Sequence, residues 1–225
     1  GQPDRSIRVS IAEGTHEVRS RAEIPEPDPI VGRESEMDKA IRCLSDNGAQ
    51  NLVVIEGMTG IGKTQFAYAL ALHLKLTYQS QILLRVSEGH MVTPESCLIH
   101  CVAASADSAI PSSMSSLRAK YYDALKGTST LILVDNLGDR ELLDELLPPP
   151  ESCAIVVTTR IAFSHTACAI DLGPLNRTDS AKLVQSNASG LLPSLATDLA
   201  EICGGHPLAL RVAGAYIANN PSIDV

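Results

Sequence analysis

Short apolar runs alternate with amphipathic segments along most of this chain of 225 residues. Continuous runs of Val, Ile and Leu are typical of strands buried in a parallel sheet, and apolar residues at helical spacing predict helices between them. Strands that alternate with helices are wound by right-handed crossovers into one sheet. The pattern therefore predicts an α/β fold, with a parallel five-stranded sheet flanked by helices. Strands are expected at 52–55, 82–86, 131–134, 154–158 and 167–172, and helices at 34–44, 63–74, 94–104, 113–125 and 139–147.

The strand pattern stops after Pro174. From there on, apolar residues recur at helical spacing, which predicts helices at 178–186, 195–203 and 208–218. We therefore expect a small all-helical subdomain after the sheet.

The N-terminal region shows neither pattern. Residues 1–25 are polar and aperiodic, and the alternating prolines at 25–29 favour an extended backbone that cannot be helical. We interpret this region as a linker, or as an arm laid across the domain. The expected boundaries are an arm at 1–29, the α/β domain at 30–172 and the helical subdomain at 173–225.

One segment carries a phosphate-binding motif. Residues 57–64 read Gly-Met-Thr-Gly-Ile-Gly-Lys-Thr, which fits GxxxxGK[ST] without a gap. A strand is predicted before the motif and a helix after it, as a P-loop requires. The glycines allow the backbone to wrap an anion, and the N–H groups at the helix start point toward it. The motif predicts binding of a purine nucleoside diphosphate or triphosphate.

Three side chains around this motif have predicted roles. Lys63 is expected to bridge the β- and γ-phosphates, and the Thr64 hydroxyl is expected to ligate Mg²⁺. Asp135 ends a buried strand, and an acid at that place can hold the Mg²⁺ shell. Many strands end in Asp before a turn, so the role of Asp135 depends on the P-loop beside it. Thr64 and Asp135 form the predicted metal site.

Two residues bear on hydrolysis. Many P-loop ATPases have a second carboxylate where this chain has Asn136, and an amide cannot accept a proton from water at neutral pH. Slow hydrolysis is therefore expected. Arg160 follows the strand at 154–158, at the sheet edge that carries ligands in open α/β folds. It would sense a γ-phosphate through a charge-assisted fork, or else be an ordinary exposed Arg. The catalytic candidates are Lys63, Asp135, Asn136 and Arg160.

Composition narrows the functional classes. The formal charge of −8 gives no sign of a basic face for nucleic acid, and nucleic-acid binding by this segment is not expected. No apolar run approaches the roughly 20 residues that span a bilayer, so no membrane partner is expected. The chain begins at Gly1 without Met, and we expect it to be a fragment of a longer protein.

The cysteines lie in apolar or helical stretches without a CxxC pair. They are predicted to be reduced, buried side chains of a cytoplasmic protein. Cys97, His100 and Cys101 fall within one helical turn, which leaves a metal site as the alternative, although no second ligand pair is visible. The six cysteines are Cys43, Cys97, Cys101, Cys153, Cys168 and Cys203.

The order of these motifs resembles the NB-ARC module of STAND signal-transducing ATPases, over residues 30–218. Val31-Gly32-Arg33 is similar to the opening motif of that family, and residues 57–64 and 131–136 are similar to its Walker A and Walker B motifs. Residues 158–160 are similar to its sensor segment, and residues 205–210 to its GLPLA box. Leu172-Gly173-Pro174-Leu175 and Asp179 are similar to the start of its helical subdomain. The Asp135-Asn136 pair looks most like the bacterial branch.

The resemblance implies an adenine-nucleotide switch. ADP would be trapped between the sheet domain and the helical subdomain at rest, and exchange for ATP would open a hinge near Gly173-Pro174 and expose an oligomerising surface. Val31, Arg33 and Pro207 would lie against the adenine. The residues expected to contact ATP or ADP are Val31, Arg33, Gly57, Thr59, Gly60, Ile61, Gly62, Lys63, Thr64, Gln65, Arg160, Pro207 and Leu208.

The resemblance also implies partners outside residues 1–225. These are fused effector and sensor domains, a winged-helix domain after the helical subdomain, and further copies of the protein on activation. Two functions stay open: a slow ATPase whose turnover resets the switch, and a non-hydrolytic assembly scaffold. A P-loop kinase is a weaker alternative, because no acceptor-binding lid or catalytic acid is evident.

Overall fold

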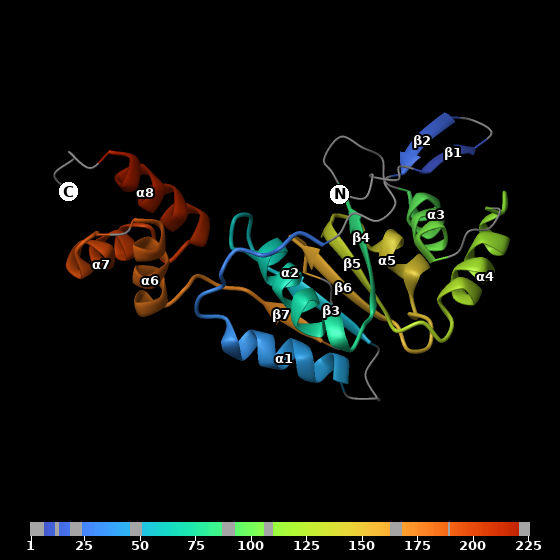
Figure 1. Ribbon diagram of the computed structural model, residues 1–225, viewed down its shortest axis with the longest axis horizontal. Helices are drawn as coiled ribbons and strands as arrows, with labels where there is room; N and C mark the ends of the chain where they lie inside the picture. Colours follow the sequence, from blue (N-terminus) through green and yellow to red (C-terminus); the bar gives the residue numbers. More distant parts are fainter. Residues whose placement is uncertain are drawn as a thin grey trace.

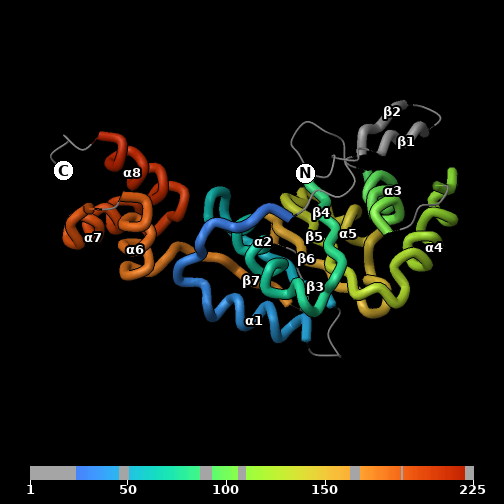
Figure 2. Tube along the Cα trace, viewed as in Figure 1, coloured from blue at the N-terminus to red at the C-terminus, as the bar shows by residue number. Residues whose placement is uncertain are grey.

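The chain folds into a sheet domain with helices on both faces and a helical lobe at one end of it (Figure 1). The computed structural model describes residues 7–11, 14–18, 24–45, 51–86, 93–105, 110–162, 168–188 and 190–220. Figure 2 shows residues 24–33 crossing the sheet domain toward the lobe and turning there into the first helix.

The described strands of the large sheet are parallel and lie in the order β4-β5-β6-β3-β7. This confirms the predicted five-stranded parallel sheet. Neighbouring residues enter two separate apolar cores, so that Val54 faces one core and Val53 the other. Because both faces are covered, the strands are apolar at nearly every position. The strands are β3 (Leu52–Glu56), β4 (Ser80–Arg85), β5 (Thr130–Leu137), β6 (Ala154–Thr159) and β7 (Ala169–Asp171).

Helices cover the sheet in two layers. Helices α1 and α2 pack on one face, and α3, α4 and α5 pack on the other. No helix in the described part of the chain is both long and apolar enough to cross a bilayer. The helices are α1 (Glu34–Ser45), α2 (Lys63–His73), the short 3₁₀ helix η1 (Leu74–Leu76), α3 (Pro94–Ser105), α4 (Met114–Leu125) and α5 (Arg140–Leu146).

The lobe contains α6 (Arg177–Asn187), α7 (Pro193–Ile202) and α8 (Pro207–Asn219) around its own apolar core. The boundaries follow local chemistry. Pro193 and Pro207 open α7 and α8, where a missing N–H costs nothing. Gly214 in α8 lies against α6, since a Cβ there would be 3.2 Å from the Val184 carbonyl oxygen. A Cβ at this place would force Asn187 or Val184 of α6 to give way by a few tenths of an ångström, so glycine lets the two helices approach this closely.

The expectation of an aperiodic arm at residues 1–25 was wrong for part of that segment. Strands β1 (Ile7–Ile11) and β2 (Gly14–Val18) form an antiparallel pair, with Ile7 opposite Val18. Apolar residues at 7, 9 and 11 alternate with polar ones, and this period of two is the strand signal that the prediction missed. Residues 24–30 have no regular secondary structure, as expected.

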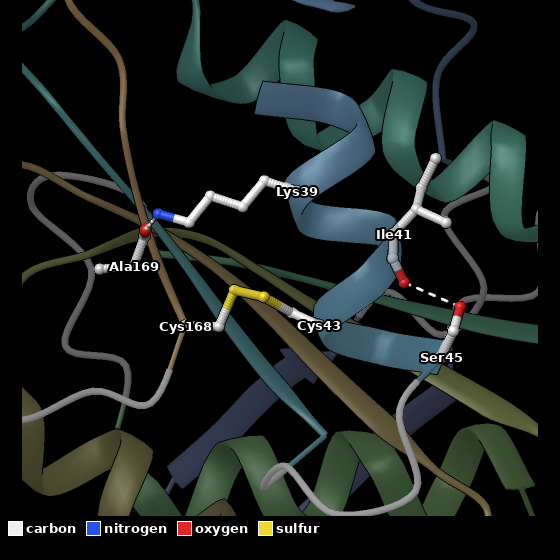
Figure 3. The surroundings of a disulfide bond; sticks show 6 residues. All are labelled: Lys39, Ile41, Cys43, Ser45, Cys168 and Ala169. Atoms are coloured by element: carbon white, nitrogen blue, oxygen red, sulfur yellow. Dashed lines mark hydrogen bonds between the residues drawn. A yellow bond between two sulfur atoms is a disulfide. The ribbon is translucent and has the colours of Figure 1, made fainter. Parts of the chain in front are cut away.

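The prediction that the six cysteines are reduced was also wrong. Cys43 in α1 and Cys168, immediately before β7, form a disulfide across 125 positions of sequence (Figure 3). Their spacing gives no hint of this bond, because it depends on how α1 packs beside the sheet edge.

The other cysteines of the described chain are free thiols, and Cys97, Cys101 and Cys153 are buried. Burial raises the pKa of the Cys97 thiol to about 12 and raises the pKa of Cys101 and Cys153 as well. They therefore behave as small apolar side chains, as predicted. Within the described residues, no group of three His, Cys, Asp or Glu side chains is placed to hold a metal.

The close contact at Gly214 leads to the first prediction. Gly214→Leu should destabilise the lobe, by about 1–3 kcal/mol, because the new side chain must push α8 away from α6. Urea denaturation measures the loss. Ala215→Leu is the matched control, since Ala215 is exposed on the same helix. Equal midpoints for the two variants would contradict the packing described for Gly214.

Candidate nucleotide-binding site

The P-loop joins the end of β3 to the start of α2, as the sequence predicts. Its backbone has positive φ at three glycines, Gly57, Gly60 and Gly62, and at two of them a side chain would also collide with a neighbour. Gly57 has φ of +145°, and a Cβ there would lie 2.7 Å from the carbonyl oxygen of Leu172. Gly60 has φ of +78°, and a Cβ there would lie 2.7 Å from Cε1 of His206. The loop is therefore pressed between the edge of the sheet and the lobe.

Lys63 points back over the loop that precedes it. Its ammonium donates hydrogen bonds to the carbonyl oxygens of Gly57, at 2.7 Å, and Met58, at 2.8 Å. Burial and the nearby positive charge of Arg160 lower the pKa of Lys63, while Asp135 partly offsets this shift. Two cations held near one loop repel each other, and an anion bound between them would relieve that repulsion. The arrangement suits a polyphosphate.

Asp135 is the centre of a small network of hydroxyl groups. Its Oδ1 accepts hydrogen bonds from the hydroxyls of Thr64 and Thr158, each at 2.7 Å. The hydroxyl of Tyr68 donates to Oδ2 over 3.4 Å, and Arg85 in turn donates to the Tyr68 oxygen at 2.8 Å. Asp135 is only 8% exposed, so these donors replace water around its carboxylate.

The structure thus brings together the two residues predicted to form the metal site. The Thr64 hydroxyl and the Asp135 carboxylate face each other directly. Both offer hard oxygen atoms, and Mg²⁺ is usually held by one or two such protein groups together with phosphate oxygens and water. The donor set therefore fits this ion.

Asn136 has a structural role that the sequence does not reveal. Strand β5 continues past Asp135 to Leu137 with a register irregularity, and Asn136 has φ of +65° there, a region that Asn tolerates better than most residues. Its side-chain amide donates to the carbonyl oxygen of Val86 at 3.0 Å, and its N–H donates to the Thr158 hydroxyl at 2.8 Å. The residue therefore joins the ends of three neighbouring strands.

A cavity of about 490 Å³ lies between the P-loop, the segment before α1 and the N-terminal end of α8. The described basic side chains that line it are Arg33, Lys63, Arg160 and Arg211, against one acid, Asp28. Most of the predicted contact residues meet here. Gly57 and Asp135 lie outside the lining. The predicted residues that line the cavity are Val31, Arg33, Thr59, Gly60, Ile61, Gly62, Lys63, Thr64, Gln65, Asn136, Arg160, Pro207 and Leu208.

Two of the residues expected to lie against the adenine, Arg33 and Val31, also hold parts of the protein together. Arg33 is buried, and its guanidinium donates to the carbonyl oxygen of Gly173 at 2.5 Å and pairs with Glu36 at 3.0 Å. Val31 packs against the apolar core of the lobe. The opening motif therefore links the sheet domain to the chain segment that enters the lobe.

Sequence reasoning missed several lining residues. Asp28 is the most telling, since its N–H donates to the Gln65 side chain at 2.9 Å and its carboxylate pairs with Arg211 of α8 at 2.5 Å. Arg211 could have been noticed in the sequence, because it is the one charged residue within α8 and so indicates a polar partner or ligand. Nothing local marks Asp28 as its partner. The missed lining residues are Asp28, Pro29, Ile30, Phe66, Thr158, Leu175, Leu183 and Arg211.

His206 is a further contact that the motif did not predict. Its Nδ1 accepts the Ala209 N–H at 3.4 Å and so caps α8, which leaves Nε2 as the donor to the Thr59 carbonyl oxygen at 3.0 Å. Beside it, the N–H of Leu208 donates to the Gly60 carbonyl oxygen at 3.3 Å. The first turn of α8 is therefore docked directly on the P-loop.

The sequence matches a known protein family over several of the segments that form this cavity. The family model for the NB-ARC domain matches residues 33–185, which include the P-loop, the Asp135 strand and the start of the lobe. This match confirms the resemblance predicted from the motifs.

Relatives of known sequence are similar over most of this chain. The regulatory protein AfsR of Streptomyces griseus is 31% identical over 175 residues, which cover 73% of this chain and 18% of AfsR. The probable disease resistance protein RF9 of Arabidopsis thaliana is 24% identical, over 90% of this chain and 22% of RF9. The chain thus spans about a fifth of the length of these relatives.

Solved structures show the same fold. The STAND protein with a tetratricopeptide repeat sensor, PH0952 from Pyrococcus horikoshii, has a TM-score of 0.60 at 20% identity and covers 83% of this chain and 30% of its own. Cdc6p from Pyrobaculum aerophilum has a TM-score of 0.63 at 13% identity and covers 90% of this chain and 65% of its own. The sheet domain is therefore a P-loop NTPase fold.

The position of Lys63 leads to the second prediction. Lys63→Ala should reduce binding of ATP and ADP by at least about a hundredfold, because it removes a cation placed over the P-loop. Isothermal titration calorimetry measures the loss. Lys75→Ala is the control, since Lys75 is exposed and lies beyond the C-terminal end of α2, which begins at the loop. Undiminished affinity in a folded Lys63→Ala variant would contradict the role of Lys63.

Proposed function

This chain belongs to the NB-ARC family, and on that premise we propose that it is the adenine-nucleotide switch module of a STAND-type regulator. The observation that carries the proposal is the shared cavity: the P-loop forms one wall, and α8 of the lobe forms another. A ligand in this cavity touches both parts of the molecule, so its binding bears on how they are held together.

The proposed ligand is ATP or ADP with Mg²⁺. Its phosphates would lie on the P-loop amides and Lys63, where α2 begins and adds partial positive charge. The base would lie at the other end of the cavity, between Val31 and Arg33 on one side and Pro207 and Leu208 on the other. When bound, Mg²⁺ would neutralise phosphate charge, held by Thr64 and Asp135.

The proposed switch uses the contacts between lobe and sheet domain. His206 and Leu208 contact the P-loop, and Arg211 pairs with Asp28 on the segment before α1. A ligand shifts the balance between closed and open arrangements only by its different affinity for the two. We propose that ADP holds the closed, resting form, and that ATP favours opening at Gly173-Pro174 and self-association.

Arg160 is the proposed sensor of the γ-phosphate. It lines the cavity at the end of β6, close enough to Lys63 to lower the pKa of that ammonium. A positive charge at this edge of the sheet would interact with a third phosphate more strongly than with the first two. This difference would let the protein distinguish ATP from ADP.

The proposed hydrolysis is slow or absent. Asn136 takes the place where a second acid would orient water, and its amide is bonded to Val86. Among the described lining residues the acid is Asp28, which is paired with Arg211. A non-hydrolytic assembly scaffold is therefore the alternative to a slow ATPase, and a P-loop kinase has weaker support.

Other parts of the proposal concern the whole protein. The relatives are about five times longer than the part that matches, which supports fused effector and sensor domains. We propose a cytoplasmic location, and adenine nucleotide and further copies of the protein as partners, with no nucleic acid or membrane bound by this segment.

The sensor role leads to the third prediction. Arg160→Ala should weaken ATP binding about tenfold and leave ADP binding nearly unchanged, because in the proposed arrangement the lost charge would face the third phosphate. Calorimetry with both nucleotides measures the difference. Arg160→Lys should give a smaller loss, since it keeps the charge. Equal losses for ATP and ADP would contradict the proposed sensor.

The fourth prediction separates the two functions that remain open. In a single-turnover assay with excess protein and radiolabelled ATP, phosphate release should take hours. The reason is that the amide of Asn136 cannot accept a proton from water. Release within seconds would contradict the role given to Asn136. Tight binding without any release would favour the scaffold over the slow ATPase.

A further inference from the structure

Beside apolar packing, one disulfide and two hydrogen bonds in the described part of the chain join α1 and the residue before it to the segment that contains β7. Cys43 is bonded to Cys168, and the ammonium of Lys39 donates to the Ala169 carbonyl oxygen at 2.7 Å (Figure 3). The third contact, between Arg33 and the Gly173 carbonyl oxygen, lies immediately before α1, at the opposite end of the helix from Cys43. The two segments run in opposite directions over similar lengths, about 15 Å for ten helical residues and about 16 Å for five extended ones.

The other side of this segment belongs to the P-loop strand. β7 pairs with β3, and the flanking residues continue the ladder: Val54 N–H donates to the Cys168 carbonyl oxygen and Leu172 N–H to that of Glu56. Leu172 then lies against Gly57, the first residue of the P-loop. Among the described strands, β3 is the ladder partner of β7. The edge strand is therefore held by β3 on one side and by α1 on the other.

The same segment leads into the lobe. Gly173 receives the Arg33 bond next to the cavity, and two residues later the Leu175 N–H donates to the Gly205 carbonyl oxygen at 2.9 Å. Gly205 directly precedes His206, which contacts the P-loop. A shift of residues 168–173 would thus reach both the cavity wall at Arg33 and the first turn of α8.

From this placement we propose that the Cys43–Cys168 disulfide is a reversible redox site that controls how tightly the cavity holds its nucleotide. The proposal rests on the function proposed above. With the bond closed, the start of β7 is fixed to α1, the Arg33 wall stays in place and the nucleotide leaves slowly. With the bond open, the edge strand keeps its ladder with β3, two side-chain contacts and the burial of Ile170 and Leu172, but it loses its covalent link to α1, and the nucleotide leaves faster.

The chemistry is thiol–disulfide exchange with an external dithiol. Cys43 is partly exposed and Cys168 is buried, so the attacking thiolate reaches the Cys43 sulfur and displaces the Cys168 thiolate. The second thiol of the reagent then attacks the mixed disulfide, releases Cys43 and leaves the reagent as its own disulfide. Two electrons and two protons pass to the protein, and the reverse reaction closes the bond. In a reducing cytoplasm, a disulfide of this kind is more often a redox sensor than a permanent link.

The coupling must be reciprocal. If reduction weakens nucleotide binding by some factor, bound nucleotide must make the disulfide harder to reduce by the same factor. A link that only stabilises the fold would lower the unfolding temperature on reduction, but would leave nucleotide affinity unchanged. The two roles therefore differ in a measurable quantity.

The first measurement is the thiol count. Alkylation of the denatured, non-reduced chain followed by mass spectrometry should modify four of the six cysteines, those outside the disulfide. Modification of six cysteines after exposure to an oxidised dithiol would overturn the proposal.

The second measurement, and the fifth prediction, is the rate of nucleotide release. Fluorescent N-methylanthraniloyl-ADP, chased with excess ADP in a stopped-flow instrument, should leave the dithiothreitol-treated chain on the order of three- to tenfold faster than the oxidised chain. Binding with equal release rates would overturn the redox proposal alone. Failure of both the oxidised and the reduced chain to bind the probe or ADP would overturn the proposed function as well.

Matched variants complete the test. The double variant C43S/C168S should release the probe at the fast rate with or without reductant, whereas Cys203→Ser, which removes a free thiol, should respond as the parent chain does. If the double variant does not fold, the parent chain is equilibrated in buffers of graded dithiol–disulfide ratio. ADP should then make the midpoint potential more negative, by about 30 mV for a tenfold coupling. An unchanged midpoint would overturn the proposal.

Discussion

The hydrogen-bonded position of β3 between β6 and β7 determines the rest of the site. On one side, the ladder through β6 and β5 brings Thr158 and Asp135 beside the start of α2. On the other side, β7 carries Leu172 against Gly57 and leads into the lobe. The P-loop therefore lies between the predicted metal site and the connection to the second part of the molecule. A change in the shape of the P-loop would therefore affect both the Thr64–Asp135 pair and the connection to the lobe.

The cavity belongs to both parts of the molecule, and the hydrogen bonds and ion pairs between α8 and the sheet domain are few, beside the apolar packing of Val31 on the lobe. One imidazole, one ion pair and one main-chain bond connect the described part of α8 to the P-loop and to the segment before α1. Contacts of this kind are individually weak in water. The bound ligand would therefore contribute a large share of the closing energy, which is the condition for a nucleotide to control the arrangement.

The sequence predicted most of the structural features that are determined by residues close together in the chain. The apolar strands, the P-loop and the Thr64–Asp135 contact follow from short motifs whose context is a strand or a helix. The missed features join residues that are distant in sequence: Asp28 with Arg211, and Cys43 with Cys168. Their partners are chosen by packing, which a single sequence does not encode locally. The hairpin at 7–18 was missed for another reason, since its alternation was hidden in a polar segment.

The contact between Asn136 and Val86 has a consequence for how this module could evolve. A change to Asp at that position would remove the donor and set a carboxylate beside the carbonyl oxygen that now accepts its hydrogen bond. Gaining a stronger base would thus require a compensating change near the end of β4. Under the proposed function, the hydrolysis rate and the contact between the ends of β4 and β5 would therefore change together at position 136.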